Sequence, residues 1–234
     1  VYDRLIELAP HDYSARSNRL MCLNYRDSCD GVTIFRSHRE WEENLKKPIK
    51  SFKSSSKPSR GPLKVGLVSP DLWTHSVANL LIPLLKYNDR EEFHLTCYSD
   101  TQVPDETTEM LKRCSNSWRE IRNLGDEFVA KRIKSDTIDI LIDLAGHTGN
   151  NRLTLFARRA APIQINWLGY PTTTGLSQMD FRLTDVIADP PGLTEAFHSE
   201  VLVHLQPCFL CYSQPNEIPL LKVKHRPVTF GSFN

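Results

Sequence analysis

Apolar residues recur at helical spacing through residues 1–45. A first apolar cluster, at 5–8, ends at the Ala9-Pro10 pair, and a second helical stretch covers 15–23. A third covers 31–45, where Ile34, Trp41 and Leu45 fall on one face. The polar residues 11–14 offer capping groups for the second stretch. The pattern predicts three short helices in this part of the chain.

A helix that stops at an Ala-Pro turn and is followed at once by another helix is typical of a tetratricopeptide repeat. A generic helical hairpin explains residues 1–25 equally well, because about one repeat is present and the repeat test needs several. His38 lies in the third predicted helix. We expect it to be packed or exposed there rather than to act in catalysis.

The pattern changes at residue 63. Short runs of β-branched, aliphatic and aromatic residues at 63–69, 93–98, 138–144, 163–167 and 201–205 predict strands. Intervals near 76–87, 105–115, 125–136 and 151–159 have helical spacing. Strands that alternate with helices indicate a parallel sheet covered by helices, so the predicted fold is α/β and Rossmann-like.

This alternation divides the chain into four predicted parts. Residues 1–47 form the helical segment, and 48–62, rich in Ser, Lys and Pro, form a linker. Residues 63–226 form the Rossmann-like lobe. Residues 227–234 are again strand-like, and because a strand needs neighbours, they are expected to begin a further lobe.

Composition limits the classes of protein that fit. A hydrophobic content of 40% and a charged content of 24% are ordinary for a globular protein. The formal net charge of +1 argues against a nucleic-acid partner, and the basic cluster at 46–64 is expected to be a solvated linker. No apolar run approaches the roughly 18 residues that span a bilayer. No membrane partner is therefore expected.

The six cysteines are scattered, and Cys208 and Cys211 form a lone C-x-x-C pair in an apolar, strand-like run. A second pair that would complete a zinc site is missing, so no metal is expected. Reduced, buried thiols of a cytosolic protein are the expected state.

The first turn with unusual composition follows the strand at 63–69. Pro70 ends the strand, and Asp71, Thr74, His75 and Ser76 lead into an apolar helix. A helix N-terminus attracts anions, and an aspartate four residues from a histidine can orient its ring. The alternative is that Thr74 or Ser76 only caps the helix and that His75 is a surface residue.

Two later turns share this character. The turn at 143–151 contains Gly146, His147 and Gly149, and its two glycines permit close backbone approach but form no dinucleotide fingerprint. The turn at 167–175 contains two glycines and four hydroxyl groups. Each turn is also compatible with a purely structural role. Since ligands bind beyond the carboxyl ends of strands in such sheets, the three turns are expected to converge.

Taken together, these segments resemble the catalytic region of the O-linked N-acetylglucosamine transferase / SPINDLY family of protein glycosyltransferases. The resemblance covers 63–234, and the helical start resembles the tetratricopeptide arm before that region. It is carried by VGLVSPDLWTHSVA (65–78), IDILIDLAGHTGNNRL (138–153), FARRAAPIQINWLGYPTTTGLSQMDFRLTD (156–185), ADPPG (188–192), FLCY (209–212) and VTFGSFN (228–234).

The resemblance implies a two-lobed, GT-B type fold and assigns roles to residues. His75 matches the catalytic histidine proposed as a base, and Asp71 the aspartate before it. The remaining residues are expected near the donor sugar: Thr74, Ser76, Val77, Gly146, His147, Leu168 and Gly169. The catalytic lysine and most nucleotide contacts of the family are expected beyond Asn234. Residues 1–234 alone are therefore expected to be inactive.

The implied reaction is an inverting transfer of N-acetylglucosamine from UDP-GlcNAc to Ser or Thr of acceptor proteins, without a metal or other cofactor. His75-Ser76-Val77 is closer to the SPINDLY and bacterial branch, so GDP-fucose is the alternative donor. A non-catalytic helical-repeat module for protein interaction is a further alternative. The family implies a cytoplasmic location, with the nucleus as a second compartment.

Overall fold

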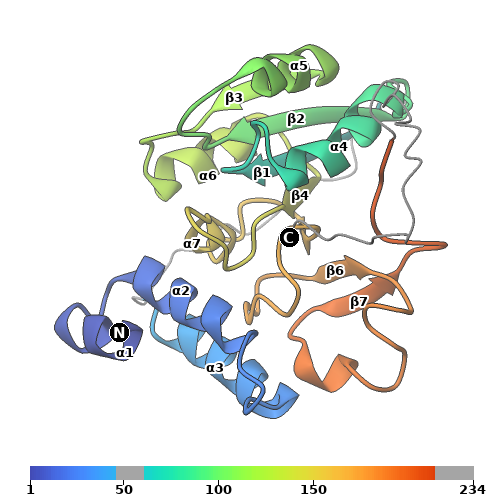
Figure 1. Cartoon of the computed structure of the whole chain (residues 1–234). Coiled ribbons are helices and arrows are strands. Elements are labelled where there is room, and N and C mark those ends of the chain that lie inside the picture. Colours follow the sequence, from blue (N-terminus) through green and yellow to red (C-terminus); the bar gives the residue numbers. More distant parts are fainter. Residues whose placement is uncertain (46–60, 214–234) are drawn as a thin grey trace, which may run out of the picture.

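The computed structural model describes residues 1–45 and 61–213, and its centre is a parallel sheet (Figure 1). The sheet has seven strands in the order β3-β2-β1-β4-β5-β6-β7, and every neighbouring pair is parallel. The strands are β1 (Leu63–Ser69), β2 (Phe93–Ser99), β3 (Ser117–Glu120), β4 (Ile140–Asp143), β5 (Ile163–Asn166), β6 (Phe181–Thr184) and β7 (Val201–His204).

The strand order reverses next to β1. The chain moves from β1 outward through β2 to β3, then returns to place β4 on the other side of β1. Because all strands are parallel, the turns that follow them lie at one edge, and the turns after β1 and β4 diverge there. A crevice forms at such a reversal, so the topology itself selects a ligand site.

Helices connect the strands, and local side chains set their starts. His75 caps α4, while Asp105 and Thr108 form a capping box at α5. Asp12 and Asp30 cap α2 and α3 in the same manner. The helices are α1 (Tyr2–Leu8), α2 (Tyr13–Leu23), α3 (Gly31–Glu43), α4 (Ser76–Tyr87), α5 (Glu106–Cys114), α6 (Asp126–Ser135) and α7 (Leu153–Phe156), with a 3-10 turn, η1 (Glu195–Phe197).

Alternate residues of the strands feed two separate cores. Leu67 and Cys97 pack with the apolar faces of α4 and α5. Val68 and Tyr98 point the other way and pack with α6, α7 and the helices α2 and α3. This division follows from the two-residue period of a strand, and it buries both faces of β1 from Val65 to Ser69.

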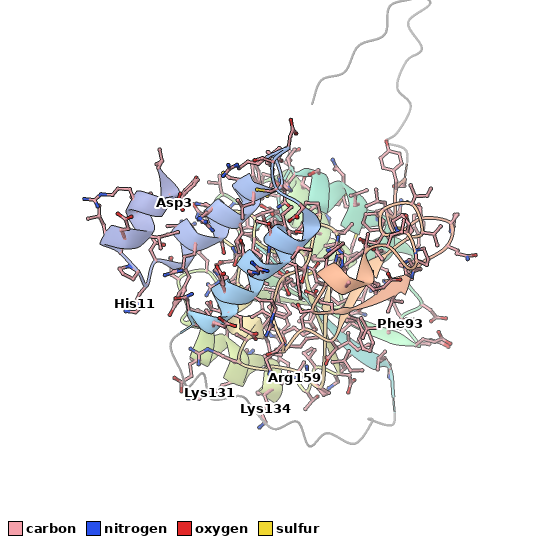
Figure 2. All side chains as sticks on the ribbon, turned by 90° about the horizontal axis from the view of Figure 1, so that it is seen from below. Asp3, His11, Phe93, Lys131, Lys134 and Arg159 are labelled. Atoms are coloured by element: carbon pink, nitrogen blue, oxygen red, sulfur yellow. The ribbon has the colours of Figure 1, made fainter. Side chains whose placement is uncertain are left out.

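The helical segment shares the second of these cores and is not a separate body. Leu20 and Trp41 pack in the same cluster as Phe156 and Leu176. The backbone of α3 also touches Gly175, where an added Cβ would lie 2.4 Å from the carbonyl oxygen of His38. Figure 1 shows α1–α3 gathered at one end of the molecule, away from β3 and α5. Figure 2 likewise places Asp3 and His11 across the molecule from Phe93.

The predicted α/β fold is confirmed, with corrections in detail. β3 and β6 were not predicted, and α7 ends at Phe156 rather than near 159. Cys208 and Cys211 lie in irregular chain, and Cys97 is the one fully buried thiol among six free cysteines. Within the described residues, no helix is long and apolar enough to cross a bilayer.

Two predicted parts are not tested. Most of the predicted linker 48–62, and all of the predicted strand at 227–234, lie outside the described residues. The tetratricopeptide assignment of residues 1–47 also stays a prediction.

Candidate functional site

Three turns at the carboxyl edge of the sheet enclose an open cleft of about 350 Å³. They follow β1, β4 and β5, which are neighbours in the sheet, so the predicted convergence is found. The cleft is large enough for a small ligand. Its walls come from the first turn and α4 (Asp71, His75, Ser76, Val77, Leu80), from the second turn (Thr148, Gly149, Asn150) and from the third (Leu168, Gly169).

His75 lies at the N-terminus of α4 and is partly buried. Its Nδ1 accepts a hydrogen bond from the backbone N–H of Val77 at 3.2 Å. With Nδ1 accepting, the neutral ring carries its hydrogen on Nε2. His75 is therefore arranged to donate from Nε2, and it must change tautomer and release Val77 before Nε2 accepts a proton.

Asp71 is held beside this histidine by the turn itself. Its backbone N–H donates to Oγ of Ser69 at 2.9 Å. Partial burial raises the pKa of the Asp71 carboxyl, while the charge of His75 and a hydrogen bond from Trp73 lower it. The Trp73 ring is stacked with that of His75 at a centroid distance of 5.9 Å. Asp71 and His75 therefore lie together in the lining of the cleft.

Thr74 and Ser76, the neighbours of His75, lie in different surroundings. Thr74 turns toward α5, where its N–H donates to Oδ2 of Asp105 and its hydroxyl meets that of Thr107, each at 2.8 Å. Ser76 and Val77 line the cleft as expected. Thr74 is outside the cleft lining, so its contacts here are those of a structural turn residue.

The turn after β5 forms one wall of the cleft with Leu168 and Gly169. Leu168 has φ of 73°, a left-handed conformation that is uncommon for a residue with a side chain. At Gly169, an added Cβ would lie 2.1 Å from the carbonyl oxygen of Leu144, so only glycine fits. A strained backbone conformation persists only where the surrounding structure holds it, and such positions cluster at binding and active sites.

The turn after β4 is held from beneath by Asp143, which ends the strand and is buried. Its carboxylate accepts from the backbone N–H groups of Ala145 and Gly146 at 3.2 and 2.7 Å, and from Nδ2 of Asn166 at 2.9 Å. Burial raises the pKa of Asp143 to about 6, although these hydrogen bonds oppose the rise. Asp143 therefore ties the second turn to β5.

Gly146 and His147 do not line the cleft, contrary to the expectation that they meet the donor sugar. Both are buried, and His147 faces the helical segment. Its Nδ1 lies 3.0 Å from Oγ of Ser17, and its Nε2 lies 2.8 Å from the carbonyl oxygen of Thr174. The physical reason is that the helices α2 and α3 cover this side of the turn.

The residues expected near the donor sugar did not include three cleft residues of that second turn, Thr148, Gly149 and Asn150, although the two glycines of the turn were noted for their close backbone approach. A signal existed, because a hydroxyl and an amide next to a glycine, directly after a buried strand, are suited to contact a polar ligand. Asn150 has φ of 57°, which asparagine tolerates better than most residues. These residues take the place in the cleft that Gly146 and His147 were expected to hold.

A second hollow, of about 520 Å³, is unsuitable for a sugar. It lies beside α4 on the sheet face, and apolar side chains such as Ile142, Ile165, Trp167 and Phe209 line almost all of it. Within residues 1–45 and 61–213, no group of three or more His, Cys, Asp or Glu is arranged to hold a metal ion. The polar cleft at the strand ends is therefore the candidate site.

This combination of a parallel Rossmann-like sheet and a polar cleft at its reversal point agrees with a comparison of the sequence with known families. Residues 40–227 match the model of glycosyl transferase family 41. The chain belongs to this family, and the resemblance predicted from its motifs is confirmed.

Similar individual proteins support the assignment. The chain is 38% identical over 244 residues to the "Probable UDP-N-acetylglucosamine--peptide N-acetylglucosaminyltransferase SPINDLY" of Oryza sativa subsp. japonica, an alignment that covers all of this chain. It is 32% identical over 160 residues, 66% of the chain, to the corresponding SEC protein of Arabidopsis thaliana.

A solved structure confirms the fold class. The K341M mutant of the Thermobaculum terrenum O-GlcNAc transferase matches 93% of this chain with a TM-score of 0.87 and 31% identity. This chain spans 42% of that protein, 26% of the rice protein and 16% of the SEC protein. The lobe is thus one part of a two-lobed glycosyltransferase architecture.

Proposed function

We propose that this chain supplies the first catalytic lobe of a protein O-glycosyltransferase. The enzyme transfers N-acetylglucosamine from UDP-GlcNAc to a Ser or Thr hydroxyl of an acceptor protein. The names of the rice and Thermobaculum relatives support the sugar and the peptide acceptor. The observation that carries the proposal is the cleft in which His75 faces the backbone wall of Leu168 and Gly169.

The proposed reaction is a single displacement with inversion at the anomeric carbon. The acceptor oxygen bonds to that carbon as the bond to the diphosphate oxygen breaks, and the hydroxyl proton passes to a base or to water. No covalent sugar–enzyme intermediate is needed. Stabilising the departing diphosphate is typically the larger contribution, and a base adds to it.

In this scheme His75 acts first as a hydrogen-bond donor. Its Nδ1 is occupied by Val77 N–H, so Nε2–H is the group it can offer to an oxygen in the cleft. The left-handed turn at Leu168 and the Cβ-free Gly169 let a sugar approach the backbone on the opposite wall. Asp71 lines the same wall of the cleft as His75, and partial burial raises the pKa of its carboxyl.

GDP-fucose is the alternative donor. The His75-Ser76-Val77 sequence at the start of α4 resembles the SPINDLY branch, and the SPINDLY proteins of rice, tomato and petunia are 36–38% identical to this chain. The proposal includes no metal or other cofactor. Its acceptor partners are cytoplasmic proteins, with nuclear proteins as a second group.

The test is an assay of the full-length protein that contains this chain. The protein is incubated with UDP-GlcNAc or GDP-fucose and an acceptor protein mixture, and sugar on Ser or Thr is detected by mass spectrometry. Transfer from UDP-GlcNAc supports the proposal, and transfer from GDP-fucose alone replaces it with the alternative donor. If the folded full-length protein uses neither donor, the result favours the remaining alternative, a non-catalytic module for protein interaction.

A further inference from the structure

The residue that follows the cleft wall, Tyr170, is bonded to the helical segment. Its ring is buried, and its hydroxyl oxygen lies 2.8 Å from Nε2 of His38 on α3 and 3.0 Å from Nδ2 of Asn24 at the end of α2. These partners are 132 and 146 residues away in sequence. One phenolic group thus joins the third turn to two helices.

The direction of each hydrogen bond is fixed. Nδ1 of His38 lies 2.7 Å from the carbonyl oxygen of Ile34, which can only accept, so Nδ1 carries the hydrogen. Nε2 of the neutral His38 ring therefore accepts from the Tyr170 hydroxyl. Asn24 donates to the same hydroxyl oxygen through its amide nitrogen. The phenol donates once and accepts once, and no buried polar group of this contact is left unpaired.

The ring of Tyr170 is also confined from the side of the second turn. A Cβ added at Gly146 would lie 2.2 Å from the Cβ of Tyr170, so the side chain rests directly on that glycine backbone. The ring of His147 meets the Tyr170 ring at a centroid distance of 5.4 Å in an edge arrangement. A shift of the Tyr170 side chain therefore requires the second turn to move as well as the third.

Its chain neighbours are the two residues that form the cleft wall. Gly169 lies against the carbonyl of Leu144, and Leu168 has a left-handed backbone conformation, of the kind that persists where the surrounding structure holds it. Leu168 and Gly169 themselves make no contact with the helical segment among the hydrogen bonds described for residues 1–45 and 61–213. Thr172 and Gly175 of the same turn are also hydrogen-bonded to the helices, but Tyr170 is the bonded residue that directly follows the wall.

We propose that Tyr170 is a positioning residue for the sugar site, through which Asn24 and His38 of the helical segment hold the wall formed by Leu168 and Gly169. This inference rests on the proposed function only in that the cleft receives the donor sugar. The helical segment thereby contributes to donor binding from a distance, in addition to any part it has in binding acceptor proteins.

The test uses the full-length protein and four variants. Tyr170→Phe keeps the ring against Gly146 and removes the hydroxyl, and His38→Leu removes the acceptor. His38→Gln keeps an oxygen that can accept from Tyr170. Glu42→Gln is the matched control, because Glu42 on α3 bonds Ser177 across the same interface at 2.6 and 2.8 Å without touching Tyr170. Hydrogen–deuterium exchange of residues 168–170, the melting temperature and steady-state kinetics are measured.

Tyr170→Phe and His38→Leu are expected to speed exchange at 168–170 and raise the KM for the donor, each by about fivefold, the effect of one lost hydrogen bond. The change in kcat is expected to be smaller, and His38→Gln restores much of the loss. Glu42→Gln is expected to lower the melting temperature without either effect.

The inference is overturned if Tyr170→Phe leaves exchange at 168–170 no faster than in Glu42→Gln, whatever its melting temperature. It is also overturned if His38→Gln behaves like His38→Leu. The exchange measurement needs no turnover. If the unaltered full-length protein transfers no sugar, the proposed function fails, and exchange still decides whether Tyr170 holds the wall.

Discussion

Oγ of Ser17 lies 3.0 Å from Nδ1 of His147, and this contact joins helix α2 to the turn after β4. Burial lowers the pKa of His147 well below 6.5, so its ring is neutral; because Nε2 donates to the carbonyl oxygen of Thr174, Nδ1 has no hydrogen and accepts from the serine hydroxyl. Both ring nitrogens of His147 are therefore hydrogen-bonded. A few ångströms away, His38 is bonded in the same directed manner, and the two rings meet at a centroid distance of 5.0 Å.

Acid is expected to destabilise the fold through these two histidines. Burial lowers the pKa of His38 from 6.5 to about 4, and it lowers the pKa of His147 well below 6.5. Between these values the unfolded chain binds protons that the folded chain excludes. Their stabilising contribution is thus complete above pH 6.5 and is lost as the pH falls toward 4, with His38 accounting for on the order of 3 kcal/mol.

Urea unfolding at several pH values between about 7 and 4.5 measures this loss. His38→Gln removes one titrating group and is expected to flatten the fall in the free energy of unfolding. Asp143 acts in the opposite sense, because its pKa is raised to about 6, so its contribution grows as the pH falls from 6 to 3.8. Parallel curves for the variant and the unaltered protein would show that His38 is not the group responsible.

Substitutions of His75 are expected to lower kcat much more than they lower the stability of the fold. Asparagine is a good helix cap and can accept from Val77 N–H in place of Nδ1, so His75→Asn should keep the melting temperature. His75→Ala should cost about 1 kcal/mol of stability through the lost cap. Both variants of the full-length enzyme should lose about 100-fold or more in kcat, the usual contribution of a positioned proton-transfer or hydrogen-bonding group.

Steady-state kinetics and thermal unfolding of the same preparations check this prediction. Full activity in His75→Asn would remove the imidazole from the chemistry. A loss of kcat only in the less stable His75→Ala variant would assign His75 to helix capping alone.

Gly146→Ala is expected to be strongly destabilising. The new methyl would meet the Cβ of Tyr170 at 2.2 Å, and the residue would have to keep φ of 56°. Overpacking and backbone strain each cost about 1–3 kcal/mol. Gly149→Ala in the same turn is the control, because nothing lies within 4 Å of its added Cβ. Equal free energies of unfolding for the two variants would contradict the close contact between the second and third turns.

Trp167→Ala is expected to lower the free energy of unfolding by about 3–5 kcal/mol, the usual cost of deleting a buried large side chain. The Trp167 ring is buried, and its Nε1 donates to the carbonyl oxygen of Phe209 at 2.9 Å. Trp73, which is 40% exposed, provides the control, and Trp73→Ala should cost about 1 kcal/mol or less. Similar melting temperatures for the two variants would show that Trp167 contributes little to the core.

The hydrophobic pattern predicted the helices and strands whose ends are marked by neighbouring residues in the sequence. The helix at 76–87 and the strand at 63–69 have the predicted bounds, because apolar runs and a capping turn define both ends locally. β3 and β6 escaped because each has four residues and little apolar pattern. In β6, Arg182 is buried and donates to Oδ1 of Asn166 at 2.7 Å, a pairing that no local pattern reveals.

The position of the site followed from topology, but its side-chain directions did not. The rule that turns meet beyond parallel strands correctly placed His75 and Gly169 together. The rule does not predict which side chains of a turn enter the cleft. Thr148 lines the cleft whereas His147 is bonded to α2, and this difference depends on where α2 and α3 pack. Contacts such as that between Ser17 and His147 join residues 130 positions apart, beyond the reach of spacing arguments.

The bonds from α2 and α3 to the third turn also limit how such chains can be recombined. A chimaera that takes its helices from a distant relative would bury Tyr170 and His147 against side chains not matched to their donors and acceptors. A crossover upstream of Asp12 preserves Ser17, Asn24 and His38 together with the loops they bond. Exchange of helical segments between relatives is therefore best engineered there, and not at the boundary between helices and sheet.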